Sequence, residues 1–182
     1  LLVRLASLGY AIPGTVIAIG VVIPFAWFDN SLDNWARSSF NFSTGLILSG
    51  TLAALIFSYL VRFLAVSVGA VESSLGKVKP SMDDAAHSMG YRPVQVLCKI
   101  HIPIMRASLF TAILLVFVDV LKELPATLLL RPFNFNTLAV RAYELASDER
   151  LADASSAAIM IVLTGIIPVI LLSLSITKNR YE

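Results

Sequence analysis

The sequence predicts an all-α fold, a polytopic membrane helical bundle with four transmembrane helices, and its charge distribution carries that prediction. Of the 182 residues, 57% are hydrophobic and only 14% are charged, whereas a soluble domain carries about 25% charged residues. Three stretches of 24 residues contain no charge at all: 5–28, 38–61 and 154–177. Because about 20 apolar residues suffice for a helix to cross the hydrocarbon core, each stretch is long enough to span a bilayer.

The first predicted span covers residues 8–28 and contains Pro13, which membrane helices tolerate as a kink when neighbouring helices satisfy the freed backbone groups. A polar link over residues 29–41 follows it. The second predicted span covers residues 44–64, with Arg62 near its end. We expect this arginine to snorkel to the lipid headgroups, as long basic side chains do at helix ends.

The third span is predicted over residues 104–120 and the fourth over 154–176. Three charged residues, Asp119, Lys122 and Glu123, lie at or just beyond the end of the third span. Their spacing of three and four residues allows one helix face to carry all three. They form either an internal ion pair at the outer end of the span or a set that lines or gates a translocation pathway.

Four spans place both termini and residues 65–103 on the same side of the membrane. That side carries nine lysine and arginine residues, and the opposite side carries five together with most of the acidic residues. Cytoplasmic loops of membrane proteins carry the excess of basic residues. The sequence therefore predicts that residues 65–103 are cytoplasmic.

This loop is predicted to contain a helix-turn-helix. Ser81 followed by Asp84 resembles a capping box, and Gly90 suits a left-handed helix end. A second helix is expected to begin near Pro93 and to end at Pro103. The resulting apolar stripe either packs beneath its own bundle or enters a groove on a cytosolic partner, and it consists of Met82, Ala85, Ala86 and Met89.

The same residues closely resemble the EAA motif of ABC importer permeases. That motif reads Glu-Ala-Ala, three residues, glycine, nine residues and Ile-x-Leu-Pro, and both spacings match here with an aspartate for the glutamate and an isoleucine for the leucine. In that family the motif forms a coupling helix that docks into a cleft of the ATP-hydrolysing subunit. The resemblance implies a docking element made of Asp84, Ala85, Ala86, Gly90, Ile100, Ile102 and Pro103.

The resemblance extends along most of the chain. Residues 9–14, 122–133 and 143–149 are similar to the corresponding regions of ferric iron permeases. The resemblance implies that residues 1–182 form a single transmembrane permease domain, the C-terminal portion of a type I ABC importer permease. Within it, residues 72–103 are the cytoplasmic coupling loop, and the domain is expected in the bacterial inner membrane.

The resemblance also implies the cargo and the partners. Iron(III) is the preferred cargo, and thiamine, polyamine, sulfate and molybdate remain alternatives because their permeases share this scaffold. The expected partners are a separate ABC ATPase subunit, a periplasmic substrate-binding protein, a second permease half and the lipid bilayer. No cofactor is expected. Carboxylate oxygens such as those of Asp119 and Glu123 suit ferric ion, although they do not define a metal site.

Other classes of function receive little support. A net charge of +2 without a basic run does not indicate a nucleic-acid partner. An intramembrane enzyme is the alternative from a different class, but His87 and His101 lie 14 residues apart and form no zinc-binding helix motif. We predict both as surface residues of the loop. The sequence contains neither a Gly-x-Ser-x-Gly elbow nor a phosphate-binding loop, so ATP hydrolysis is expected in a partner subunit.

Overall fold

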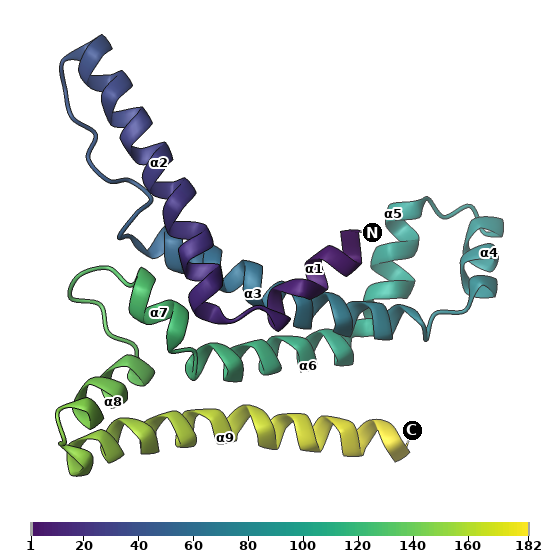
Figure 1. Cartoon of the computed structure of the whole chain (residues 1–182). Helices are drawn as coiled ribbons and strands as arrows, with labels where there is room; N and C mark the ends of the chain where they lie inside the picture. Colours follow the sequence, from purple (N-terminus) through teal and green to yellow (C-terminus); the bar gives the residue numbers. More distant parts are fainter. Residues whose placement is uncertain (1, 182) are drawn as a thin grey trace.

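The computed structural model describes residues 2–181, and the side chains of residues 7–171, 173 and 174. Every regular element within these residues is a helix (Figure 1). Four helices are long and apolar enough to cross a membrane: Gly14–Phe40, Leu52–Leu75, Pro93–Leu121 and Leu151–Leu171. The predicted all-α, four-span architecture is therefore confirmed.

The elements follow one another with short connections. Their bounds are α1 (Leu2–Ala11), α2 (Gly14–Phe40), α3 (Leu52–Leu75), α4 (Pro80–Ser88), α5 (Pro93–Val96), a π-helical segment (Leu97–His101), α6 (Ile102–Leu121), α7 (Pro125–Leu130), α8 (Leu138–Ser147) and α9 (Leu151–Tyr181). In Figure 1, α4 and α5 lie at one end of the long helices and α7 and α8 at the other. The first helix begins and the last helix ends at the α4–α5 end, as a four-span topology requires.

The first span differs from the prediction, because Pro13 breaks the helix completely instead of kinking it. The chain leaves α1 at Ala11 and begins α2 at Gly14. A proline has no backbone N–H to continue the bonding of the preceding helix. Its carbonyl oxygen instead accepts the first bonds of the new helix, from the backbone nitrogens of Val16 at 3.0 Å and Ile17 at 3.2 Å.

The predicted polar link over residues 29–41 is wrong, because α2 continues through these residues to Phe40. Two carboxylates one helical turn apart hold the chain that returns along α2. Asp29 is fully buried and accepts hydrogen bonds from the backbone nitrogens of Leu48 and Ser49. Asp33 accepts those of Thr44 at 2.8 Å and Gly45 at 3.2 Å. The polar residues therefore anchor a return segment and do not form a link.

The second span consequently begins later than predicted. Residues 42–51 are not helical, and α3 starts at Leu52 after the hydroxyl of Thr51 accepts a hydrogen bond from the backbone of Ala53. The third and fourth spans lie where the sequence predicts them, since α6 contains residues 104–120 and α9 contains residues 154–176.

A small apolar core joins α2, α3 and α7. Small residues such as Ala18, Ala54 and Ala126 are almost fully buried in it and allow the helices to approach closely. The cluster consists of Ile17, Ala18, Val21, Ala54, Leu55, Ala126 and Leu130. Most large apolar side chains on the long helices face outward instead, which is the arrangement expected of helices surrounded by lipid.

Candidate functional site

The predicted coupling region forms a hairpin of α4 and α5, and its first helix begins at Pro80. Lys79 occupies the N-cap position without a side-chain hydrogen bond. The predicted capping box of Ser81 and Asp84 is therefore wrong. Proline suits the first helical position because its φ angle is already helical and its missing N–H is not needed there, so the helix starts before Ser81.

The turn between the two helices is the one the sequence predicts. Gly90 has a φ of +78°, a left-handed conformation that glycine adopts without strain. Its backbone nitrogen donates to the carbonyl of His87 at 2.9 Å, and that of Tyr91 donates to the carbonyl of Ala86 at 3.1 Å. This pair of bonds is the Schellman motif, which closes the end of a helix. The second helix then begins at Pro93, as predicted.

Pro103 does not end the second helix, contrary to the prediction. The helix passes from α5 through the π-helical segment into α6, and residues 93–121 form one continuous apolar helix. Within the π segment the backbone nitrogen of Ile102 donates to the carbonyl of Leu97, five residues earlier. This wider turn comes immediately before Pro103, which cannot donate an α-helical bond. The second helix of the hairpin, α5, is thus the beginning of a transmembrane helix.

The predicted docking residues do not share one environment. Ala86 is fully buried within the chain, and Ile100 is half-buried. The remaining five are exposed: Asp84, Ala85, Gly90, Ile102 and Pro103. Within the described residues, the apolar stripe of α4 therefore packs beneath its own bundle only at Ala86, and Met82 and Met89 remain 39% and 68% exposed.

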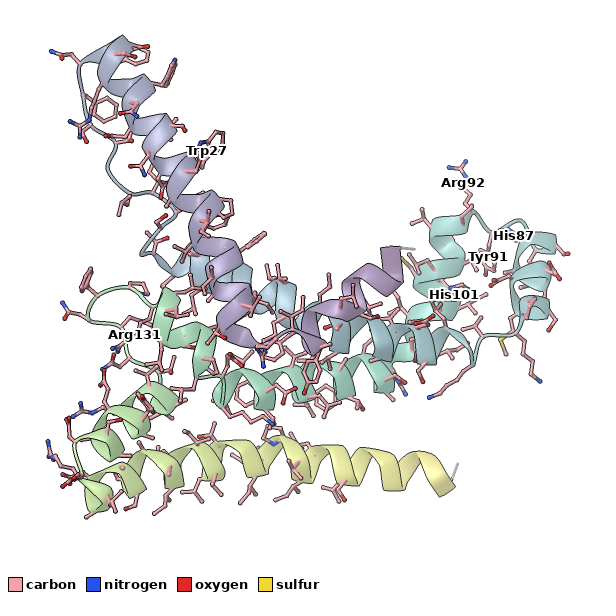
Figure 2. All side chains as sticks on the ribbon, viewed as in Figure 1. Trp27, His87, Tyr91, Arg92, His101 and Arg131 are labelled. Carbon is pink, nitrogen blue, oxygen red and sulfur yellow. The ribbon has the colours of Figure 1, made fainter. Side chains whose placement is uncertain are left out.

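A hydrogen bond between His101 and Asp83, which the sequence does not predict, ties the hairpin together. The Nε2 atom of His101 lies 2.7 Å from Oδ1 of Asp83, and the histidine side chain is only 18% exposed. The prediction that both histidines lie on the loop surface is therefore wrong for His101. In Figure 2 His101 lies at the base of the α5 helix, on the side toward α4, whereas His87 lies near the tip of the hairpin beside Tyr91.

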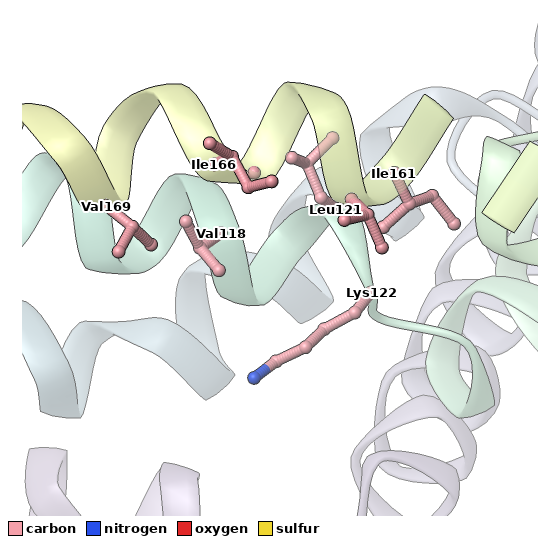
Figure 3. Close-up of a pocket in the computed structure, with 8 residues that line it drawn as sticks. Val118, Leu121, Lys122, Ile161, Ile166 and Val169 are labelled. Atoms are coloured by element: carbon pink, nitrogen blue, oxygen red, sulfur yellow. The ribbon is translucent and has the colours of Figure 1, made fainter. Parts of the chain in front are cut away.

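At the opposite end of α6, the three charged residues predicted for the pathway divide into two groups. Lys122 pairs with Asp119 at 3.0 Å, and the hydroxyl of Tyr10 donates to the same carboxylate at 3.4 Å. The hydrogen bond to Asp119 raises the pKa of Lys122. Figure 3 shows the Lys122 side chain extending away from α9, beside an apolar cavity of about 240 Å³ between α6 and α9.

Glu123 points elsewhere, because α6 ends at Leu121 and the chain turns before this residue. It is only 5% exposed, and its Oε2 atom lies 3.3 Å from Nε of Arg62. The prediction that Arg62 snorkels to the headgroups is wrong: its side chain is 19% exposed and turns into the protein. Since α3 begins at Leu52, this arginine lies near the middle of the helix and not at its end.

The Arg62–Glu123 pair lies where two helices start. The backbone nitrogen of Ala126, in the first turn of α7, donates to Oε1 of Glu123 at 3.2 Å. Gly14, the first residue of α2, approaches so closely that a Cβ atom there would lie 2.4 Å from Nη1 of Arg62 and 2.7 Å from Oε1 of Glu123. We call these four residues the helix-break junction. Among all the residues that the structure describes, no three His, Cys, Asp or Glu side chains form a group able to hold a metal ion.

The four apolar spans and the exposed hairpin define a polytopic membrane protein, and comparison with known proteins agrees. Residues 1–178 match the family described as the binding-protein-dependent transport system inner membrane component. The chain belongs to this family. It is thus part of an ABC importer permease of the bacterial inner membrane, as the EAA motif predicts.

Its relatives include two kinds of importer. The chain is 30% identical over 169 residues to the Fe(3+)-transport system permease protein FbpB 2 of Haemophilus influenzae. The aligned residues make up 93% of the chain and 30% of that protein. It is 24% identical over 170 residues to PhnV of Salmonella typhimurium, named for a 2-aminoethylphosphonate transport system, with 93% of the chain and 57% of PhnV covered. The chain therefore spans less than two thirds of the length of these relatives.

Proposed function

We propose that this chain supplies part of the permease of an ATP-driven importer that carries iron(III) across the inner membrane, and that a separate ATPase subunit docks on the α4–α5 hairpin. The observation that carries this proposal is the uncovered apolar face of α4. Met82, Ala85 and Met89 are exposed on one side of the helix, whereas Ala86 faces the protein. An amphipathic helix with such a face fits a groove on a partner protein.

The two alanines of the docking element then have different functions. Ala85 is exposed, and its small side chain allows a partner surface to approach the helix backbone closely. Ala86 is buried and sets the distance between α4 and the rest of the hairpin. The family motif therefore combines a contact residue with a spacing residue, and substitutions at the two positions should fail for different reasons.

Movement of the hairpin reaches the membrane through the helix over residues 93–121, which has no break at the membrane surface. We propose an alternating-access cycle in which ATP closes the partner dimer, the docked hairpin moves with it and the spans rock. The ATPase must bind the two conformations with different affinities, because a partner that bound both equally would shift nothing.

At the other end of α6 we propose that Asp119 and Lys122 face the translocation pathway. Lys122 is 65% exposed and Asp119 is 17% exposed, so the lysine is the more accessible member of the pair where a binding protein would deliver cargo. Glu123 is buried and paired with Arg62. This favours a structural role in the helix-break junction over direct contact with the cargo. The substrate-binding protein and a second permease half complete the proposed assembly.

The preference for iron(III) rests on the 30% identity to FbpB 2, which is named for Fe(3+) transport. The similarity to PhnV makes 2-aminoethylphosphonate the second candidate. Uptake of radiolabelled iron(III) and of radiolabelled 2-aminoethylphosphonate, measured in a strain lacking the gene and again after its restoration, separates the two. We expect the restored gene to return iron uptake alone. Iron uptake that is unchanged by the deletion would contradict the assignment.

Docking is tested by a matched pair of substitutions on α4 in the full-length protein. Ala85→Lys places a charge in the exposed apolar face, and His87→Lys places the same charge on the opposite, also exposed, side of the same helix. We expect Ala85→Lys to lose co-purification with the ATPase subunit and His87→Lys to retain it. Equal retention in both variants would exclude this face as the docking surface.

A further inference from the structure

We propose that His101 is a positioning residue for the coupling step: its hydrogen bond to Asp83 braces α4 against the helix that continues into the membrane, so that a displacement of α4 is passed to α6. This inference rests on the proposed function. It adds His101, a residue outside the docking face, and assigns it the transmission of movement from α4 to α6. The brace joins two positions 18 residues apart in the sequence.

The contact has the geometry of a strong hydrogen bond. The distance of 2.7 Å between Nε2 of His101 and Oδ1 of Asp83 lies in the range of charge-assisted bonds. The side chains are 18% and 38% exposed, so water competes with the bond only in part. Asp83 lies in the first turn of α4, and His101 is the last residue of the π-helical segment, directly before α6.

Few other contacts hold α4 to the transmembrane helix. The bond between Nδ1 of His87 and the carbonyl of Tyr91 lies within the tip of the hairpin, and so does the bond from Ser88 to the carbonyl of Asp84. Across the parts of the chain with described side chains, Asp83–His101 is the one side-chain hydrogen bond that joins α4 to the helix over residues 93–121. Without it, α4 is connected through the turn at Gly90 and through its contacts around Ala86.

The brace lies beside the docking face and not within it. Asp83 and Ala86 are three residues apart and are therefore neighbours on the helix surface, and Ala86 is fully buried. Met82, Ala85 and Met89 continue the exposed stripe on the other side of Ala86. Removal of the brace should therefore leave the docking surface intact and change only how firmly that surface is connected to α6.

His101 also lies in the part of the helix where the α-helical hydrogen bonding is interrupted. Pro103 cannot donate an α-helical bond, and the π-helical segment that compensates ends at His101. A wide turn and a proline make this part of the helix the easiest to bend. A brace at this point connects α4 to the last residue of the wide turn, directly before α6, and lets the hairpin and the span move as one body.

The test uses the full-length permease assembled with its ATPase and binding protein in proteoliposomes. His101→Phe removes the hydrogen bond and keeps a ring, His101→Gln keeps a donor, and His87→Phe is the matched control on the same hairpin. The readouts are co-purification of the ATPase and the amount of cargo transported per ATP hydrolysed. A merely structural role of His101 would lower the amount of assembled complex but not this ratio.

We expect His101→Phe to retain the ATPase and to lower the transport per ATP by about threefold to tenfold, which corresponds to the loss of one partly exposed hydrogen bond. His101→Gln should recover most of the ratio, and His87→Phe should match the wild type. If His101→Phe fails to assemble, Asp83→Leu removes the same bond from its more exposed partner and should give the same fall.

An unchanged ratio in the variants that lack the bond, an equal fall in His87→Phe, or loss of ATPase binding in both His101→Phe and Asp83→Leu would each overturn the brace. These results differ from a failure of the proposed function. If the wild-type permease does not bind an ATPase at all, the proposed coupling itself is wrong. If the wild type binds and transports while the variants do the same, only the role of the brace is wrong.

Discussion

The hairpin and the helix-break junction each join distant segments through one contact between two polar side chains, but they place that contact in different surroundings. In the hairpin, His101 and Asp83 are partly exposed beside an apolar face that this chain leaves uncovered. In the junction, Glu123 is almost fully buried against Arg62, at the start of two helices. From this comparison we expect the junction to stabilise the bundle, and we propose that the hairpin serves contact with a partner.

The physical cost of breaking each pair follows from this difference. A buried charge that loses its partner keeps its full desolvation cost, about 3–5 kcal/mol for typical pairs. A pair near the surface regains water when it opens, and its loss costs about 0–1 kcal/mol. Substitutions at the junction should therefore lower the stability of the whole protein, and substitutions in the hairpin should mainly change coupling.

The largest effect is expected for Glu123→Ala, which leaves the Arg62 guanidinium buried without its partner. We expect a loss of about 3–5 kcal/mol in unfolding free energy, measured by chemical or thermal unfolding in detergent. The double variant Arg62→Met with Glu123→Gln removes both charges and should be clearly more stable than Glu123→Ala. A single variant as stable as the wild type would mean that the pair does not support the bundle.

A smaller effect is expected for Gly14→Ala, because the added Cβ atom would clash with both charged side chains of the junction. Overpacking of this kind costs about 1–3 kcal/mol. Gly20→Ala is the matched control in the same helix, since a Cβ atom at Gly20 would meet nothing within 4 Å. Thermal unfolding of the two variants side by side tests this directly, and equal melting temperatures would contradict the close approach at Gly14.

The smallest effect on stability is expected in the hairpin, for Gly90→Ala. Its φ of +78° is strained for a residue with a Cβ atom, at a cost of about 1–2 kcal/mol. Because the turn lies at the tip of the hairpin, we expect faster amide hydrogen exchange in α4 with almost no change in the unfolding of the spans. Gly76→Ala is the control, since Gly76 has a φ of −60° and its Cβ would make only ordinary contacts. Faster exchange throughout the bundle would show that the hairpin is not an independent unit.

The features that the sequence predicts correctly are those that depend on local pattern. A long charge-free stretch locates α9 and the shorter charge-free run over residues 107–118 locates α6, because a bilayer tolerates few charges along a span. Gly90 and Pro93 locate the hairpin because each has a conformation that only certain positions of a turn or helix accept. The EAA spacing adds the family of the chain, which composition alone does not give.

The features that the sequence misses depend on which distant segments meet. Arg62 looks like a snorkelling residue until Glu123 is known to lie beside it. Asp29 and Asp33 look like parts of a polar link until the return segment is seen to bind them. Pro103 looks like a helix end because its pattern does not distinguish a stop from a π-helical turn. The sequence does contain one signal for the junction: Arg62 is a charged residue inside the predicted span over residues 44–64, and such a residue usually has a partner.

Cross-linking in the native membrane tests the central claim most directly. The one cysteine of the sequence, Cys98, is exposed on the hairpin and is first replaced by serine. A single cysteine is then introduced as Ala85→Cys, with His87→Cys as the control on the opposite side of α4. We expect a cross-link from Ala85→Cys to the ATPase subunit, whose yield changes when ATP binds, and a much weaker one from His87→Cys. Reaction of Ala85→Cys with a membrane-impermeant reagent from the periplasmic side, or the absence of any cross-link to the ATPase, would contradict it.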